Sequence, residues 1–303
     1  MAEGECRVAS VIPLDGRGVL AVEGPDRVGF LQGLVSNDVA AVGRERAVWA
    51  AVLTPQGKYL HDFFILTDGE RLLLEMPATG TADLAARLRK FRLRSKVAVS
   101  DVSADFAVAV VTGAEAPARV GLPPDKGAAA GWGDGIAFVD PRHAALGVRL
   151  VLPRAGTERA LAGLGAPGIP EAYERLRIAL GIPDGVQDLI PEKSILLENG
   201  FDELHGVSWT KGCYMGQELT ARTKYRALIK KRLLPVVVDG PLPAPGTPVL
   251  MDGKEAGEMR SGVEGLALAL LRLESVTEAE RTGTPLTAGT ARLSVQRPDW
   301  FAP

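Results

Sequence analysis

Three apolar segments joined by tight turns constrain the fold of this 303-residue chain more than any other feature of its sequence. The segments 47–53, 59–67 and 71–76 are rich in aliphatic and aromatic residues, which favour strands. The turn from Thr54 to Gly57 has proline second and glycine fourth, as type I turns favour, and Asp68-Gly69 allows a tight reversal. The sequence therefore predicts strands that return on one another.

Helical patterns alternate irregularly with these strands. Pro25 and Asp26 stand where a helix begins, after a short strand at 19–22. A second helix is expected to place Leu84, Leu88 and Phe91 on one face, and a third to run from Pro170 to a stop at Gly181. Two more strands are expected at 96–102 and 106–111, and a surface loop at 113–135. This order predicts a mixed α+β fold rather than a regular βαβ series.

The pattern changes after Lys231. Short apolar strands at 234–238, 266–273 and 291–295 alternate there with Pro/Gly turns. Such a pattern is typical of a small β-barrel or sandwich. We therefore place a domain boundary near Lys230 and interpret Lys230, Lys231 and Arg232 as a solvated charge run in a linker.

Composition excludes several classes of protein. The 35 Lys and Arg residues are balanced by 37 Asp and Glu, and this net charge of −2 disfavours nucleic-acid or anionic-membrane binding. The apolar run 266–271 is too short to span a bilayer, and the first five residues lack the basic character of a targeting segment. Two cysteines and three histidines form no metal-ligand or disulfide pattern. These features predict a reduced, cytoplasmic protein without a permanently bound metal.

The segment 211–218 carries the most unusual residues. Gly212 and Gly216 bracket Cys213 and permit an exposed loop, and Lys211 would favour the thiolate form of the cysteine. The alternative is that Cys213 packs as a small apolar residue. Glu218 and Arg222 lie four residues apart, which also suits a simple ion pair on a helix.

This segment, K-G-C-Y-M-G-Q-E-L-T-A-R, resembles the signature of the YgfZ-type folate-binding proteins, relatives of the glycine-cleavage T-protein (aminomethyltransferase). Similar segments occur in the same order at 14–18, 30–38, 53–58, 140–142, 147–149, 190–192, 231–233 and 261–272. The resemblance implies a three-domain clover-leaf around a central hole that holds tetrahydrofolate. It also implies that residues 1–229 form two intertwined α+β domains, the inner one at roughly 45–145. Residues 230–303 would form a C-terminal β-barrel.

The same resemblance implies site residues. Asp62 stands where T-protein has its essential aspartate, and Cys213 and Asp62 are the expected catalytic residues. The cofactor-binding residues expected beside Asp62 are Asn37, Gln56, Arg142, Arg149, Lys211, Tyr214, Gln217, Glu218 and Arg222. The chain departs from T-protein at Arg149, which replaces a pterin-binding glutamate, and at Tyr173, which replaces an arginine. This charge reversal predicts that folate sits differently and disfavours aminomethyl transfer.

Three functions follow from these interpretations. The first is a tetrahydrofolate-binding accessory protein for assembly or repair of iron–sulfur enzymes, with iron–sulfur client or scaffold proteins as partners and Cys213 as its working thiol. That thiol would attack an adduct, form a mixed disulfide or transiently ligate a cluster. The second is a tetrahydrofolate-dependent one-carbon transferase that uses Asp62. The third is a protein of this fold that has lost its activity and only binds a partner.

Overall fold

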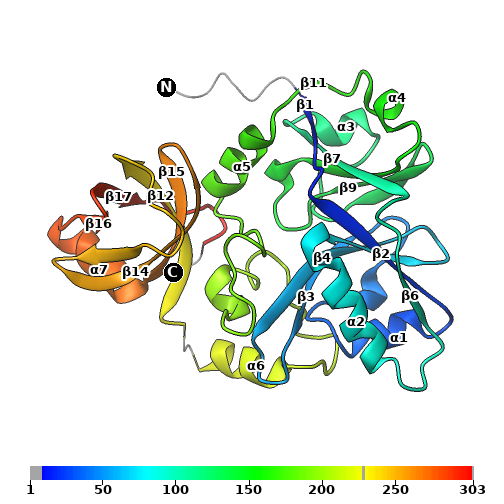
Figure 1. Cartoon of the computed structure of the whole chain (residues 1–303), viewed down its shortest axis with the longest axis horizontal. Coiled ribbons are helices and arrows are strands. Elements are labelled where there is room, and N and C mark those ends of the chain that lie inside the picture. Colours follow the sequence, from blue (N-terminus) through cyan, green and yellow to red (C-terminus); the bar gives the residue numbers. More distant parts are fainter. Residues whose placement is uncertain (1–8, 227–228, 302–303) are drawn as a thin grey trace. The chain divides into compact units, whose positions relative to one another are not determined.

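The computed structural model describes residues 9–226 and 229–301, shown as a coloured ribbon in Figure 1. These residues form two compact units, each assembled from segments far apart in the sequence. The first unit comprises 9–53, 61–173 and 205–215, and the second comprises 54–60, 174–204, 216–226 and 229–301. The mixture of sheets with short helices confirms the α+β class. Cys6 lies outside the described residues.

A five-stranded sheet in the first unit contains the strands predicted from the turns. Its order is β3-β4-β5-β2-β6, and β5 pairs antiparallel with both β2 and β4. Every residue of β3 is buried, which accounts for its unbroken apolar sequence. The strands are β2 (Arg17–Glu23), β3 (Val48–Leu53), β4 (Tyr59–Thr67), β5 (Leu72–Pro77) and β6 (Ala98–Asp101).

A six-stranded sheet in the same unit has the order β11-β1-β7-β10-β9-β8. Its strands are β1 (Ser10–Pro13), β7 (Phe106–Thr112), β8 (Ala129–Trp132), β9 (Gly135–Val139), β10 (Val148–Pro153) and β11 (Ala166–Pro167). The predicted loop 113–135 is wrong in part, because it contains β8 and the helix α3 (Ala116–Arg119). Alanines of this segment, such as Ala116 and Ala129, are buried despite its loop-like composition.

Four further helices begin in the first unit: α1 (Arg27–Gln32), α2 (Thr81–Phe91), α4 (Thr157–Leu161) and α5 (Pro170–Ala179). Leu84 and Leu88 of α2 are buried as predicted. Phe91, the last residue of the helix, is 39% exposed, so the face that these three residues share is buried only at Leu84 and Leu88. The helix ends there, and the chain turns through residues 92–95.

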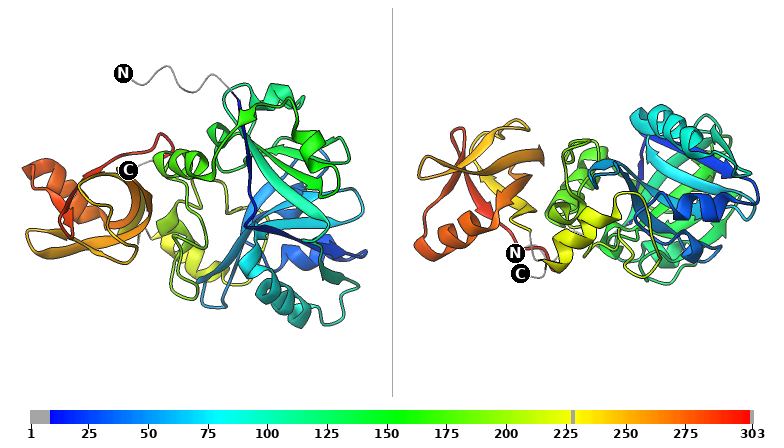
Figure 2. Two further views of the ribbon diagram at one scale, coloured as in Figure 1. Left: turned by 45° about the horizontal axis from the view of Figure 1, so that its top comes forward. Right: turned by 90° about the horizontal axis from the view of Figure 1, so that it is seen from below.

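The second unit contains a closed β-barrel with the order β12-β15-β14-β13-β16-β17, which Figure 2 shows curving round on itself. Its core consists of apolar side chains from every strand. Its strands are β12 (Lys231–Asp239), β13 (Pro248–Met251), β14 (Lys254–Val263), β15 (Leu266–Arg272), β16 (Leu286–Ala288) and β17 (Ala291–Val295). The unit also contains α6 (Gln217–Tyr225) and α7 (Leu273–Thr282), of which α7 was not predicted.

The expected solvated linker at residues 230–232 is wrong in part, because only Lys230 is exposed and outside a strand. Lys231 begins β12, and Arg232 is buried, where it donates hydrogen bonds to the Glu203 carboxylate and to the main-chain oxygen of Leu197. Buried guanidinium groups need such partners, so Arg232 fixes the start of the barrel within its unit. No helix among the described residues has both the length and the apolar character needed to cross a membrane.

Candidate functional site

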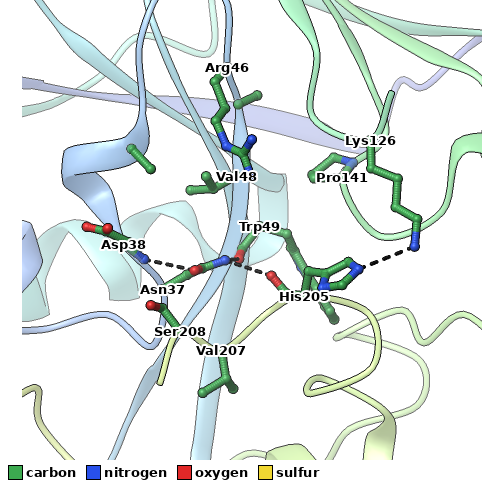
Figure 3. Close-up of a pocket in the computed structure, with 12 residues that line it drawn as sticks. Asn37, Asp38, Arg46, Val48, Trp49, Lys126, Pro141, His205, Val207 and Ser208 are labelled. Carbon is green, nitrogen blue, oxygen red and sulfur yellow. Dashed lines mark hydrogen bonds between the residues drawn. The ribbon is translucent and has the colours of Figure 1, made fainter. Parts of the chain in front are cut away.

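A polar cavity of about 470 Å³ lies in the first unit and is shown in Figure 3. Its volume falls within the range usual for small-molecule sites. It is formed by three stretches of chain, around residues 37–49, 126–141 and 205–208. The lining residues are Asn37, Asp38, Ala41, Arg46, Ala47, Val48, Trp49, Lys126, Pro141, His205, Val207 and Ser208.

Asn37 fixes one wall of this cavity. Its side-chain amide donates hydrogen bonds of 2.7 Å to the main-chain oxygens of Trp49 and His205, and its Oδ1 accepts one from the Asp38 amide (Figure 3). Asp38 in turn accepts from the amide of Ala40. Short polar side chains favour such local bonds to the backbone. Asn37, a predicted cofactor-binding residue, therefore lies in the cavity wall and also joins three segments.

The segment 205–208 is fixed by a second polar residue. The Ser36 hydroxyl donates to the Gly206 carbonyl at 2.6 Å, and the Ser208 amide donates to the Ser36 carbonyl at 3.0 Å. Ser36 is completely buried. His205 has a φ of +59°, an uncommon conformation for a residue other than glycine. These bonds hold His205 at the cavity wall.

Two exposed cations, Arg46 and Lys126, add positive charge to the cavity. Arg46 has no ion-pair partner among the described residues, and the Lys126 ammonium lies 3.4 Å from Nε2 of His205. Gly127 places Lys126, because its φ of +77° and its approach to Ala47 leave no space for a Cβ atom. These cations suit a ligand that carries carboxylates.

Trp49 connects the cavity to the predicted catalytic residue Asp62. The indole Nε1 of Trp49 donates a 2.8 Å hydrogen bond to Oδ2 of Asp62. Asp62 is only 8% exposed, as its position on the same strand face as the buried Leu60 predicted. Asp62 does not itself line the cavity, and it contacts the cavity only through its hydrogen bond to the lining residue Trp49.

Arg142 lies beside the same tryptophan. Its guanidinium group is 5.6 Å from the ring centroid of Trp49 and 4.9 Å from that of Phe64. It also forms a bidentate pair with Asp140, at 3.0 and 2.8 Å. Burial lowers the pKa of Arg142, but the carboxylate of Asp140 raises it more, and the net shift is upward. Arg142 is therefore a charged, fully engaged core residue next to the cavity.

Arg149 is buried between the two sheets of the first unit. It donates to the carboxylate of Glu75 at 3.1 and 3.2 Å and to the hydroxyl of Tyr173 at 3.0 Å. Arg17 pairs with the same carboxylate. The two positions at which the sequence departs from T-protein, Arg149 and Tyr173, are thus hydrogen-bonded to each other. Their role toward a cofactor stays a prediction.

Lys211 fixes the loop that contains Cys213, called the cysteine loop here, to the end of α1. Its ammonium group donates to the main-chain oxygens of Gln32 at 2.5 Å and Val35 at 2.9 Å, and lies 4.9 Å from the ring centroid of Tyr214. Burial lowers the pKa of Lys211 to about 8, although Asp38 and Cys213 act in the opposite direction. The amide of Met215 donates to the Gly33 carbonyl at 3.1 Å and holds the other side of the loop.

Cys213 is exposed on this loop, as predicted. Gly212 precedes it with a φ of +96°, which favours glycine, and Tyr214 follows it as a buried anchor. Gln32 links the loop to the cavity, because its amide donates to Asp38 at 2.8 Å and to the Lys211 carbonyl at 3.3 Å. Within residues 9–226 and 229–301, no three His, Cys, Asp or Glu side chains are grouped so that they could hold a metal ion.

The remaining predicted residues lie in the second unit. The turn that contains Gln56 packs against the start of α6, where a Cβ on Gly57 would lie 2.8 Å from the Gly216 carbonyl oxygen. Gln56 is exposed. Glu218 and Arg222 form an exposed pair at 2.8 Å, and Gln217 begins α6. The first unit therefore contains Asn37, Asp62, Lys211, Cys213 and Tyr214. The second contains Gln56, Gln217, Glu218 and Arg222.

Of the twelve residues that line the cavity, the sequence predicts only Asn37 as a site residue. The residues with the most distinctive chemistry among those that it does not predict are Arg46, Trp49, Lys126 and His205. Lys126 lies in the predicted surface loop, where the one local signal is the Asp-Lys-Gly turn at 125–127. Trp49 is part of the predicted strand 47–53, and nothing in that pattern distinguishes it from the other apolar residues there.

Comparisons with known proteins decide the family. A family model described as the CAF17 C-terminal beta-barrel domain matches residues 230–303. The mitochondrial iron-sulfur cluster assembly factor IBA57 of Mus musculus is 35% identical, over 95% of this chain and 84% of the mouse protein. The human protein of the same name is 36% identical, with the same coverage. The chain belongs to the family of the iron–sulfur cluster assembly factor IBA57.

The fold is confirmed by a solved structure, that of the glycine cleavage system aminomethyltransferase T from Bartonella henselae. The TM-score is 0.77 at 17% identity, and the match covers 97% of this chain and 87% of that one. The predicted T-protein-like architecture with a C-terminal β-barrel is therefore confirmed.

Two predictions are corrected by these relatives. The resemblance to YgfZ-type proteins identified a related family, but the matched relatives are IBA57 proteins. The predicted cytoplasmic location is wrong, since these relatives are named as mitochondrial. That prediction rested on the charge of the first residues and on the number of cysteines, and a low cysteine count is also compatible with other reducing compartments.

Proposed function

We propose that this protein assists the assembly of iron–sulfur clusters and that Cys213 is its working thiol. The family supports the first part, because the relatives are named as iron–sulfur cluster assembly factors. The single observation that supports the second is the exposed position of Cys213 on a loop held by Lys211 and Met215. A thiol that only filled the core would be buried.

A single thiol suits transient contact with a cluster. Iron–sulfur clusters are generally held by four protein ligands, most of them thiolates. Cys213 supplies one, and the described residues offer no metal-binding group around it. We therefore propose that the cluster is cargo and that a client or scaffold protein supplies the remaining ligands. The fixed loop would present the Cys213 sulfur to that partner.

The cavity next to this loop is proposed as a site for tetrahydrofolate, which carries one-carbon groups when bound. Two features support the fit: a volume of about 470 Å³, and the cations Arg46 and Lys126 for the glutamate carboxylates. The hydrogen bonds of Asn37 and Ser36 preorganise the wall. Gln32 and Asp38 connect the cavity to the Cys213 loop and offer a route by which ligand binding reaches the thiol.

Complementation tests the role of the thiol. A strain that lacks its own family member would express the wild type, Cys213→Ser or Cys6→Ser, and the activity of an iron–sulfur enzyme would be measured in each. We expect Cys213→Ser to lose most of the activity with an unchanged Tm, whereas Cys6→Ser should behave as the wild type. Full activity of Cys213→Ser would refute the thiol mechanism. Failure of the wild type together with both variants would instead exclude this strain as a host.

A further inference from the structure

The C-terminal end of α2 presents a cluster of cations and apolar side chains that the proposed function does not use. We call residues 90–96, Lys-Phe-Arg-Leu-Arg-Ser-Lys, the basic tip. Its four cations are Lys90, Arg92, Arg94 and Lys96, and all four are exposed. Phe91 is 39% exposed and Leu93 is 87% exposed.

The cations of the basic tip differ from those that precede it. Arg87 pairs with Asp83 at 2.6 Å, and Arg89 donates to the main-chain oxygen of Val99, so both have structural partners. The side chains of the four basic-tip cations have no ion-pair or hydrogen-bond partner among the described residues. Cations in the last turn of a helix stabilise it by interacting with the helix dipole. Arg94 and Lys96 lie beyond the last turn of α2, so this effect does not explain them.

Leu93 carries two features that folding does not explain. Its φ of +45° belongs to the left-handed region, which a leucine adopts at a cost. Its side chain is also almost fully exposed and so gains little from packing. A glycine would fit this turn better on both counts. Strain and exposed apolar surface together favour a role in binding.

The basic tip is nevertheless held in place. The carboxylate of Asp26 accepts a 2.6 Å hydrogen bond from the Lys96 amide, and the Ser95 amide donates to the Arg92 carbonyl at 2.8 Å. Asp26, Leu93, Arg94 and Ser95 line an open depression. The exposed side chains therefore extend from an ordered turn that borders a concave surface.

We propose that the basic tip is a docking surface for an acidic segment of a protein partner that also carries a large apolar side chain. Because the four cations form no ion pair within the described chain, charge complementarity favours a negatively charged binding segment. Arginine and aromatic side chains are enriched in protein interfaces, and the depression beside Leu93 offers a place for an apolar side chain. Asp26 at its edge disfavours a flat anionic membrane, which would meet this carboxylate. The inference is independent of folate binding and of Cys213.

Fluorescence anisotropy with the full chain tests the proposal. The probe is a labelled synthetic peptide in which glutamates flank one leucine and one phenylalanine. We expect saturable binding that weakens as salt is added, and a loss of about tenfold or more in the double variant Arg92→Glu/Arg94→Glu. A matched double variant, Arg159→Glu/Arg292→Glu, reverses two exposed arginines elsewhere and should change the affinity less than about twofold.

Leu93→Gly separates binding from folding. Because glycine accepts a positive φ, this variant should keep or raise the Tm, while its peptide affinity falls about threefold or more. An affinity equal to that of the wild type would show that Leu93 is no anchor and overturn the proposal. Equal losses of peptide affinity in the two double variants would show that net charge alone controls binding, and would overturn the proposal. Binding of the wild type to vesicles with 30% phosphatidylglycerol, but not to the peptide, would assign the basic tip to membranes instead.

Discussion

The guanidinium group of Arg149 lies 3.1 Å from the carboxylate of Glu75, and both side chains are completely buried. Glu75 belongs to β5 and Arg149 to β10, so the pair joins the two sheets of the first unit. Arg17 reaches the same carboxylate. The positive charge that the sequence places at 149 is therefore matched by a carboxylate inside the protein.

Glu75→Gln should destabilise the protein strongly. The change leaves Arg149 buried without a counter-charge, which costs about 3 to 5 kcal/mol in comparable pairs. Urea unfolding followed by fluorescence would measure the loss. Glu115→Gln, which breaks the exposed pair with Arg119, serves as the control and should cost less than about 0.5 kcal/mol. Similar losses in the two variants would show that the buried pair contributes no more than a surface one.

The same carboxylate predicts a loss of stability in acid. Burial raises the pKa of Glu75, but the charges of Arg149 and Arg17 lower it more, so the folded-state pKa lies below the ordinary 4.5. The stabilisation is thus present above about pH 4.5 and disappears as the pH falls through the folded-state pKa. Wild type and Glu75→Gln should therefore approach each other in unfolding free energy below pH 4.5. A constant difference from pH 7 to pH 3 would contradict this.

Lys211 should give the opposite pH dependence. Its pKa is about 8 in the folded protein against an ordinary 10.5, so the protonated form is the one that folding disfavours. This penalty is present at neutral pH and is progressively relieved as the pH rises through 8 toward 10.5. Relative to Lys211→Met, the wild type should gain about 1 kcal/mol between pH 7.5 and 9.5, a value reduced because solvent screens this partly exposed group. Between pH 6 and 7 the difference should stay flat.

Much of the fold could be predicted from the sequence, because local chemistry determines it. Strand β4 was predicted at its observed bounds, since apolar residues run between two turns with clear signatures. The cysteine loop was predicted from two glycines, which the structure shows with positive φ. In both cases a few neighbouring residues carry the whole signal.

The rest depends on contacts that no local pattern encodes. Arg149 pairs with Glu75, which lies 74 residues earlier in the chain, and no local pattern shows this pair. Lys126 reaches the cavity because the Ala47 amide donates to the Gly127 carbonyl at 2.8 Å, which connects distant segments. Arg232 looked solvated for the same reason, although Glu203 holds it in the core. Long-range pairing of polar groups is the part that sequence reasoning missed.

The cavity cations should control folate affinity. Arg46→Glu/Lys126→Glu replaces two positive charges at the lining with negative ones, and the carboxylates of tetrahydrofolate would then be repelled. Calorimetry should show that the affinity for tetrahydrofolate falls about tenfold or more. Arg159→Glu/Arg292→Glu, the exposed double variant used above, should bind tetrahydrofolate as the wild type does.

Asp62 should also affect the affinity for tetrahydrofolate, because it contacts the lining residue Trp49. Asp62→Ala should weaken binding by freeing the indole ring rather than by removing a charge from the ligand. Trp49→Phe, which keeps an aromatic ring at this position but lacks the Nε1 donor, distinguishes these two effects, since it should reproduce the loss seen in Asp62→Ala. Equal affinity in the wild type, Arg46→Glu/Lys126→Glu and Asp62→Ala would remove tetrahydrofolate from this cavity.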